Sequence, residues 1–134
     1  MKCRGYLRDS EDVSTAPIAD PYAAACPTRT VLDRIGDRWT VLVLLLLAER
    51  TCRFTELQRR IEGVSPKVLT QVLRALERDG LVTREVHAEV PPRVEYSLTS
   101  LGGTLVQAVA GLDAWARAHI DEVERSRAAY DARA

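Results

Sequence analysis

The stretch that decides the fold is RFTELQRRIEGVSPKVLTQVLRALERDGLVTREV, residues 53–86. Its first part predicts a short helix over Glu56–Ile61, which Thr55 caps, followed by a tight turn. Ser65-Pro66 then starts a second helix, because serine is a favourable N-cap and proline suits the first helical position. This second helix runs to about Asp79 and ends at Gly80.

The second helix has two faces of different chemistry. The apolar residues recur at the i, i+3, i+4, i+7 spacing of a buried helix face: Leu69, Val72, Leu73 and Leu76. The polar residues fall on the opposite side: Lys67, Thr70, Gln71, Arg74 and Arg78. Between Val64 and Leu76 there are two cations and no acid. The helix therefore offers one face to a core and one polar face to a partner.

A β-hairpin follows this helix pair. Residues 81–86 and 93–98 alternate in polarity as strands do, and HAEVPP between them is too polar and proline-rich for a central strand. Two helices joined by a short turn and followed by a hairpin form a winged helix-turn-helix. The predicted fold class is therefore α+β, mostly α.

Helices are predicted on both flanks of this motif. Before it, Cys26-Pro27 opens a helix that Gly36 closes, and Asp37 caps a second helix over Arg38–Glu49. The second helix should be the most buried one, because apolar side chains cover nearly its whole circumference. After the hairpin, Thr99 caps a long helix that frays beyond Glu124. We expect a flexible N-terminal arm at residues 1–25, one domain at 26–124 and a frayed tail at 125–134.

The polar helix face carries the side chains that read bases. Lysine and arginine can chelate guanine, glutamine can pair with adenine, and threonine can contact the thymine methyl group. Ser65, at the helix N-terminus, can help to hold a phosphate. Arg93 stands beside the hairpin tip, where an arginine suits the narrow minor groove, although a salt bridge with Glu89 or Glu95 is the alternative. The candidate DNA-binding residues are Ser65, Lys67, Thr70, Gln71, Arg74 and Arg93.

Three segments together resemble a known family. They are CPTRTVLDRIGDRW (26–39), the stretch 53–86 and VPPRVEYSLTSLG (90–102), and the chain resembles the HxlR-type winged helix regulators, which are related to the MarR-type ones. The resemblance implies a dimer that binds a palindromic operator on double-stranded DNA, often as a repressor. One departure is Asp37, where the family usually has a second glycine.

The same resemblance implies a role for Cys26. A cysteine before proline at this helix start often senses oxidants or electrophiles in the family. The position agrees physically, because a helix N-terminus favours the reactive thiolate, and Arg29 lies one turn further on. The alternative is a buried structural cysteine. Cys52 could resolve an oxidised Cys26 across a dimer.

The long last helix carries an apolar stripe that needs a partner. A domain of this size has little core left to cover the stripe, so we expect a two-fold dimer through the first and last helices. Such a dimer would place two recognition helices ~34 Å apart, in successive major grooves. The predicted dimer-interface residues are Leu101, Leu105, Val109, Leu112 and Trp115.

Composition limits the other possibilities. The 134 residues carry 19 Lys+Arg against 19 Asp+Glu, but residues 53–93 hold eight cations against six acids, where the DNA-facing elements fall. The longest apolar run, Val41–Ala48, is too short to cross a membrane, and the N-terminus has no secretion signal, so we expect a cytoplasmic protein. The spacing of the cysteines and histidines favours no metal site and no cofactor.

Three alternatives remain beside the thiol-controlled repressor. A small apolar or aromatic ligand bound near Trp39 and the dimer helices could gate the same regulator. A winged helix used only for protein contact would show no salt-dependent operator binding. An enzyme with Cys26 as nucleophile would need a base within reach, and neither His87 nor His119 is well placed, so we do not expect an enzyme.

Overall fold

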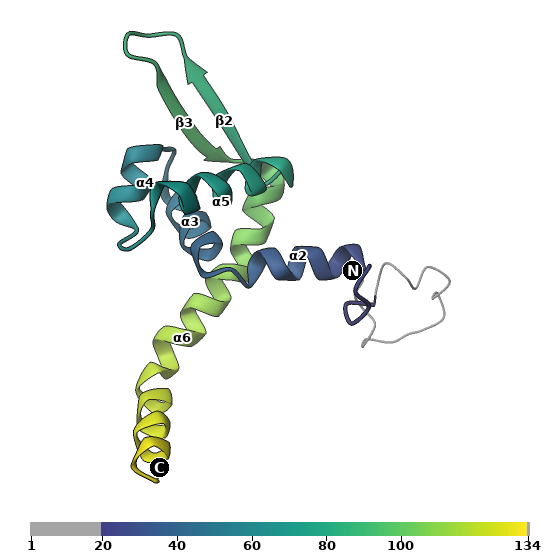
Figure 1. The fold of residues 1–134 in the computed structure, drawn as a ribbon, viewed down its shortest axis with the longest axis vertical. Helices are drawn as coiled ribbons and strands as arrows, with labels where there is room; N and C mark the ends of the chain where they lie inside the picture. Colours follow the sequence, from purple (N-terminus) through teal and green to yellow (C-terminus); the bar gives the residue numbers. More distant parts are fainter. Residues whose placement is uncertain (1–19, 134) are drawn as a thin grey trace. The chain divides into compact units, whose positions relative to one another are not determined.

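The computed structural model describes residues 20–133, and the chain divides into two compact units between residues 41 and 42. The predicted N-terminal arm lies outside the described residues, except for residues 20–25, which form turns. Figure 1 labels the helices and strands. In chain order they are α2 (Pro27–Ile35), α3 (Arg38–Glu49), β1 (Cys52–Arg53), α4 (Phe54–Arg60), α5 (Pro66–Arg78), β2 (Val82–His87), β3 (Arg93–Leu98) and α6 (Ser100–Arg133).

The first unit contains α2 and the start of α3. Helix α2 begins with Pro27 directly after its N-cap, Cys26, and ends at Gly36, as predicted. No residue of α2 itself is buried. Asp37 caps α3, because its Oδ1 accepts a hydrogen bond from the backbone N–H of Trp39 at 2.8 Å. Both helix starts therefore follow from the local signals in the sequence.

The core of the second unit is built from the helices of the helix-turn-helix and the later part of α3. Val43, Leu44 and Leu47 of α3 are buried, although Leu42 is 41% exposed. The predicted inner face of α5 is confirmed, since Leu69, Val72, Leu73 and Leu76 are all buried. Leu57 of α4 is also fully buried. This packing fixes the opposite face of α5 toward solvent.

The start of α4 differs from the prediction. The helix begins at Phe54 with Arg53 as its N-cap, rather than at Glu56 with Thr55 as the cap, and it ends before Ile61. The side chain of Glu56 accepts a hydrogen bond from the backbone N–H of Arg53 at 2.7 Å, which satisfies one of the free donors at the helix start. The physical reason is β1: the chain passes directly from this strand into the helix.

The hairpin is part of a three-stranded antiparallel sheet with the order β1-β3-β2. Strand β1, which the sequence did not predict, places Cys52 opposite Tyr96 and Arg53 opposite Glu95. Strand β2 begins one residue later than predicted and pairs with β3 from Val82↔Leu98 to His87↔Arg93. The two longer strands project beyond the helices as a wing, which is visible at the top of Figure 1.

Helix α6 is 34 residues long and continues well beyond Glu124, where the sequence predicted fraying. Thr99 caps its start as predicted: its Oγ1 accepts from the N–H of Gly102 at 3.0 Å and donates to the carbonyl of Gly80 at 2.7 Å. Ion pairs such as Arg127 with Glu124 support the later turns. In Figure 1 this helix runs away from the wing. None of the helices from residue 20 to 133 has a stretch long and apolar enough to span a bilayer.

These observations confirm the predicted fold class. The second unit is a mostly helical α+β winged helix-turn-helix, in which α4 and α5 are the two motif helices and β2–β3 is the wing.

Candidate nucleic-acid interface

The outer face of α5 presents most of the predicted DNA-binding residues to solvent. Lys67, Gln71 and Arg74 are exposed, and they lie on the side of the helix opposite the buried leucines. Thr70 is half-buried, and its hydroxyl donates to the carbonyl of Pro66 at 2.8 Å, so its methyl group is the part left for an apolar contact. The arrangement has the amphipathic form that a major-groove helix requires.

Ser65 holds the start of this helix in place. Its Oγ accepts a hydrogen bond from the backbone N–H of Val68 at 3.1 Å, which confirms it as the N-cap. The hydroxyl proton is still able to donate, because a serine hydroxyl is both acceptor and donor. Ser65 is exposed, so it offers this donor at the positive end of the helix dipole, where a phosphate would bind.

The structure places Arg93 in the alternative arrangement. Its Nη1 lies 2.9 Å from Oε2 of Glu89, its Nε lies 3.5 Å from Oε2 of Glu95, and the side chain is only 27% exposed. A guanidinium held between two carboxylates is not available to a DNA groove unless those ion pairs break. The spacing of Arg93 and Glu95 along β3 and the path of the hairpin tip at Glu89 thus favour the salt bridges over a minor-groove contact.

A second arginine of the wing, Arg84, occupies a position that the sequence analysis missed. It is exposed on β2 and, with Arg74, lines a pocket of about 350 Å³ where α5 meets the wing. The other lining residues are Thr70, Leu73, Glu77 and Tyr96. Guanidinium groups bind phosphate oxygens well, so two of them at one pocket suit a DNA backbone contact. Strand alternation places Arg84 on the same face of β2 as the buried Val82, so only the fold shows that it is exposed beside Arg74.

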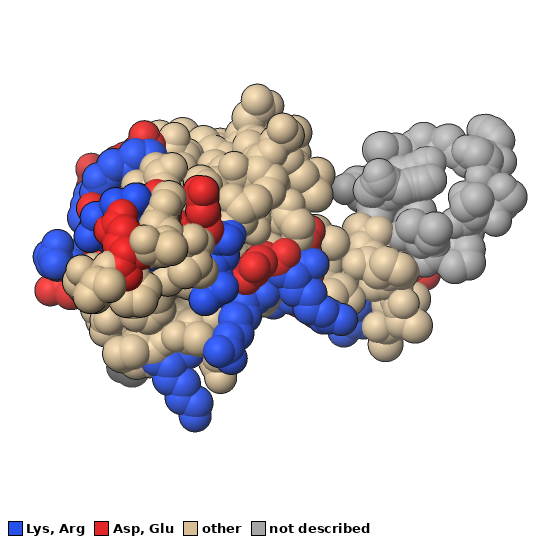
Figure 2. Space-filling model, turned by 90° about the horizontal axis from the view of Figure 1, so that it is seen from above, with Lys and Arg blue, Asp and Glu red and all other residues tan. Residues whose placement is uncertain are grey.

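Charge on the wing side of the molecule is mixed. Figure 2, viewed from the side of the hairpin, shows acidic as well as basic groups on this face. The hairpin itself, residues 82–98, holds two arginines and three glutamates. Its formal charge is therefore −1, which does not by itself attract a polyanion.

The two cysteines of the described chain lie in different settings. Cys26, the N-cap of α2, is 2% exposed. Arg29, one helical turn after it, donates a hydrogen bond from Nη1 to the carbonyl of Tyr22 at 3.3 Å. Cys52 is also 2% exposed, and its Sγ donates to the carbonyl of Arg50 at 3.5 Å. Burial raises the pKa of the Cys52 thiol, an effect that the nearby Arg50 partly opposes. Cys52 is therefore held in its less reactive, protonated form.

Three of the five residues of the predicted dimer stripe on α6 are exposed. Leu101, Leu112 and Trp115 are 56%, 59% and 57% exposed, and Leu105 is half-buried. Val109 is fully buried and so belongs to the core. It has no exposed surface that a partner subunit could cover. Ile120, which the sequence prediction left out of its interface, is 45% exposed.

Comparison with known proteins gives matches over most of the chain. Residues 34–124 match the model of the HxlR-like helix-turn-helix family. The uncharacterized HTH-type transcriptional regulator YtfH of Escherichia coli (strain K12) is 48% identical over 102 residues, which cover 76% of this chain and 81% of the relative.

Two solved structures agree with this match. The ytfH regulator of Salmonella typhimurium superposes with a TM-score of 0.75 at 44% identity, covering 79% of this chain and 95% of that one. The redox regulator HypR in its reduced form gives a TM-score of 0.69 at 38% identity, covering 74% and 98%.

Proposed function

Because the chain belongs to the HxlR-like helix-turn-helix family of transcriptional regulators and is not an enzyme, we propose that it is a homodimeric repressor of a palindromic operator. The observation that carries the proposal is the outer face of α5, where Lys67, Gln71 and Arg74 stand exposed opposite a fully buried apolar face. These side chains would read base edges in the major groove. Ser65, at the N-terminus of the same helix, would donate to a phosphate.

Direct DNA binding tests this assignment. A duplex selected from a random pool by the wild-type protein serves as the probe, and fluorescence anisotropy at fixed salt gives the affinity. Lys67→Ala and Arg74→Ala should each lose roughly 1–3 kcal/mol of binding free energy, because each removes a contact to a base. Arg117→Ala, on exposed α6, is the matched control and should bind like the wild type. Unchanged affinity in both α5 variants would exclude α5 as the reading element.

The dimer is part of the proposal because the apolar stripe of α6 needs cover. Leu101, Leu112 and Trp115 expose more than half of their surface. In α2, Val31 and Leu32 are about equally exposed, at 51% and 50%. Burying such side chains against a second copy would stabilise the dimer by about 25 cal/mol per Å² of apolar surface. The two α5 helices would then read the two halves of the palindrome together.

Control by the thiol of Cys26 is the regulatory part of the proposal. HypR, which is similar in structure, is a redox regulator, and Cys26 stands at the N-cap of α2, directly before Pro27. A peroxide would convert the thiolate to a sulfenic acid with loss of hydroxide, and a small-molecule thiol or the same cysteine of a second subunit would then form a disulfide with loss of water. The added bulk or cross-link beside α2 would change the spacing of the two α5 helices and release the DNA.

Comparison of two cysteine variants tests this control. Treatment with a mild peroxide should weaken operator binding by the wild type by at least about tenfold, which corresponds to 1.4 kcal/mol. Cys26→Ser should keep its affinity. Cys52→Ser is a matched control, since Cys52 is equally buried, and it should respond like the wild type. If Cys26→Ser releases DNA as the wild type does, the signal is received elsewhere.

A further inference from the structure

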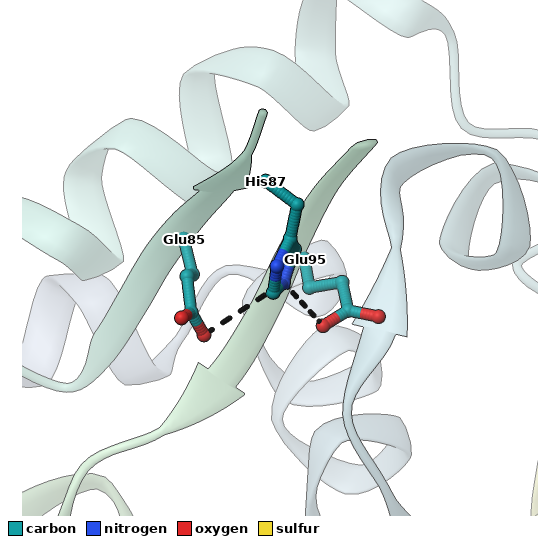
Figure 3. Close-up of side chains that lie close together, drawn as sticks. All are labelled: Glu85, His87 and Glu95. Atoms are coloured by element: carbon teal, nitrogen blue, oxygen red, sulfur yellow. Dashed lines mark hydrogen bonds and ion pairs between the residues drawn. The ribbon is translucent and has the colours of Figure 1, made fainter. Parts of the chain in front are cut away.

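Three potential metal ligands converge on one face of the wing, close to its tip. Glu85 and His87 are two residues apart on β2, so their side chains lie on the same face of the sheet. The pairing register places Glu95 of β3 directly opposite Glu85. Figure 3 shows the three side chains pointing toward one another across the two strands.

Two of the distances between these groups are close to those of a coordination sphere. Nε2 of His87 lies 2.9 Å from Oε1 of Glu95 and 3.9 Å from Oε1 of Glu85. One ligand atom from each residue falls within 4.8 Å of the other two. Zinc bonds to imidazole nitrogen and carboxylate oxygen at about 2.0–2.2 Å, so tetrahedral ligand atoms stand about 3.4 Å apart. The two measured distances bracket this value.

The surroundings hold two of the ligands in place. His87 and Glu95 expose only 27% and 29% of their side chains. The second oxygen of Glu95, Oε2, lies 3.5 Å from Nε of Arg93, and Arg93 in turn pairs with Glu89. Oε1 of Glu95 is hydrogen-bonded to Nε2 of His87, so these two ligand atoms already face one another. Glu85 is 71% exposed, so the site is open on its side.

We propose that Glu85, His87 and Glu95 form a binding site for a divalent transition metal on the wing, with zinc the best match. One imidazole and two carboxylates are ligands that Zn²⁺ accepts, and three protein ligands leave a position for water. The imidazole would bind through the Nε2 lone pair with its ring proton on Nδ1. The metal would also tie β2 to β3 near the tip of the hairpin.

Metal binding would change the charge of the wing, an effect that rests on the proposed DNA-binding function. The hairpin of residues 82–98 has a formal charge of −1, and a divalent cation changes it to +1. A positive wing is attracted to DNA phosphates, whereas a negative one is repelled. Zinc should therefore raise the affinity for DNA.

Binding of the metal alone is tested first. The full-length reduced protein is titrated with ZnCl2 by calorimetry and with CoCl2 by absorption, in which cysteine ligands give an intense charge-transfer band. We expect about one equivalent of metal, no such band, and affinity reduced by at least about tenfold in His87→Ala and in Glu95→Gln. His119→Ala is the matched control, because this histidine lies on α6 and contacts the carbonyl of Trp115. Circular dichroism checks that each variant is folded.

Two results would overturn the site: equal Zn²⁺ affinity in the wild type and His87→Ala, or a thiolate band in the cobalt spectrum of the one-equivalent complex. The effect on DNA is measured separately, with the selected duplex at saturating ZnCl2. Wild-type affinity should rise by at least about threefold, whereas His87→Ala should not respond. Zinc binding without that rise would keep the site and overturn the charge effect. Loss of DNA binding under every condition would instead contradict the proposed function, while the calorimetry would still decide the metal site.

Discussion

At the scale of single residues, Glu56 couples the stability of α4 to pH. Its carboxylate accepts the backbone N–H of Arg53, and this hydrogen bond lowers the pKa of Glu56 below its ordinary value of 4.5. A group whose pKa is lowered in the folded state stabilises that state above the unfolded pKa, and the contribution is lost as pH falls through the folded pKa. The stabilisation by Glu56 is therefore complete at neutral pH and disappears in acid.

Urea unfolding of Glu56→Gln measures this contribution. At pH 7 the variant should have a lower free energy of unfolding than the wild type, because an amide accepts the same hydrogen bond without the charge. The difference should shrink as the pH is lowered below about 4.5. Glu62→Gln, an exposed acid in the turn after α4, is the control. A difference between wild type and Glu56→Gln that is constant from pH 7 to pH 3 would contradict the capping role of the charge.

The two arginines of the wing should contribute differently to DNA binding. Arg84 is exposed beside the pocket it shares with Arg74, whereas the guanidinium of Arg93 is held by Glu89 and Glu95. Arg84→Ala should weaken binding to all duplexes alike. It should also reduce the slope of log affinity against log salt concentration by about 1, because one phosphate contact is lost. Arg93→Ala should change the slope less. If Arg93→Ala lowered the salt slope more than Arg84→Ala, the ion pairs of Arg93 would have to open when the protein binds DNA.

Sequence reasoning reached the face of α5 but not the partners of the wing arginines. Once the start of a helix is known, its period gives the side on which each residue lies. Lys67, Gln71 and Arg74 could therefore be assigned to the outer face of α5 from their spacing alone. The pairing of Arg93 with Glu89 depends on the path of the hairpin tip. The meeting of Arg84 with Arg74 depends on how the wing packs on α5. Neither leaves a periodic signal in the chain.

At the scale of elements, the junction of α6 with the helix-turn-helix depends on one of two adjacent glycines. A Cβ at Gly102 would overlap the carbonyl oxygen of Leu81 and press on the side chain of Leu98, whereas a Cβ at Gly103 meets nothing within 4 Å. Gly102→Ala should therefore destabilise the fold by about 1–3 kcal/mol through overpacking. Gly103→Ala should stabilise it by up to about 1 kcal/mol, because alanine favours a helix. Thermal unfolding gives the melting temperature of each variant. Equal changes in the two melting temperatures would contradict the close approach of Gly102 to the carbonyl of Leu81.

The elements with strong end signals are those that the sequence predicted best. Pro27, Asp37, Ser65 and Thr99 each mark a helix start that the structure confirms. Strand β1 has only two residues and is defined by its pairing with β3, so no alternation could reveal it. The end of α6 was placed too early because the apolar stripe does not continue through its last turns, where charged residues and alanines prevail. A helix without an apolar face gives no periodic signal, although alanines and an i, i+3 ion pair such as Arg127 with Glu124 favour it.

At the scale of the whole molecule, charge balance makes assembly decisive. The chain carries 19 cations and 19 anions, so it has no excess of positive charge for general attraction to DNA. Non-specific binding should therefore be weak, and operator binding by the proposed dimer should depend on base contacts made by two subunits at once. A second subunit adds its contacts at high effective concentration, which raises affinity without any new kind of contact.

The exposed stripe of α6 allows this dependence to be tested. Leu112→Asp places a charge in the centre of the proposed interface and should raise the dimer dissociation constant by at least about tenfold, because an unpaired charge would be buried there. Ala114→Asp is the matched control: it adds the same charge to the same helix, but helical periodicity places residue 114 on the opposite side. Light scattering and sedimentation give the oligomeric state of each variant.

The same two variants separate assembly from base reading. Leu112→Asp should lose most of its affinity for a full palindrome while its weak binding to a half-site is unchanged, because α5 of each subunit is intact. The side chain of Leu112 is 59% exposed, so the variant should fold normally, and circular dichroism verifies this. A Leu112→Asp protein that is still a dimer and binds the palindrome like Ala114→Asp would exclude α6 as the dimer contact. The exposed face of α2, at Val31 and Leu32, would then be the surface to vary.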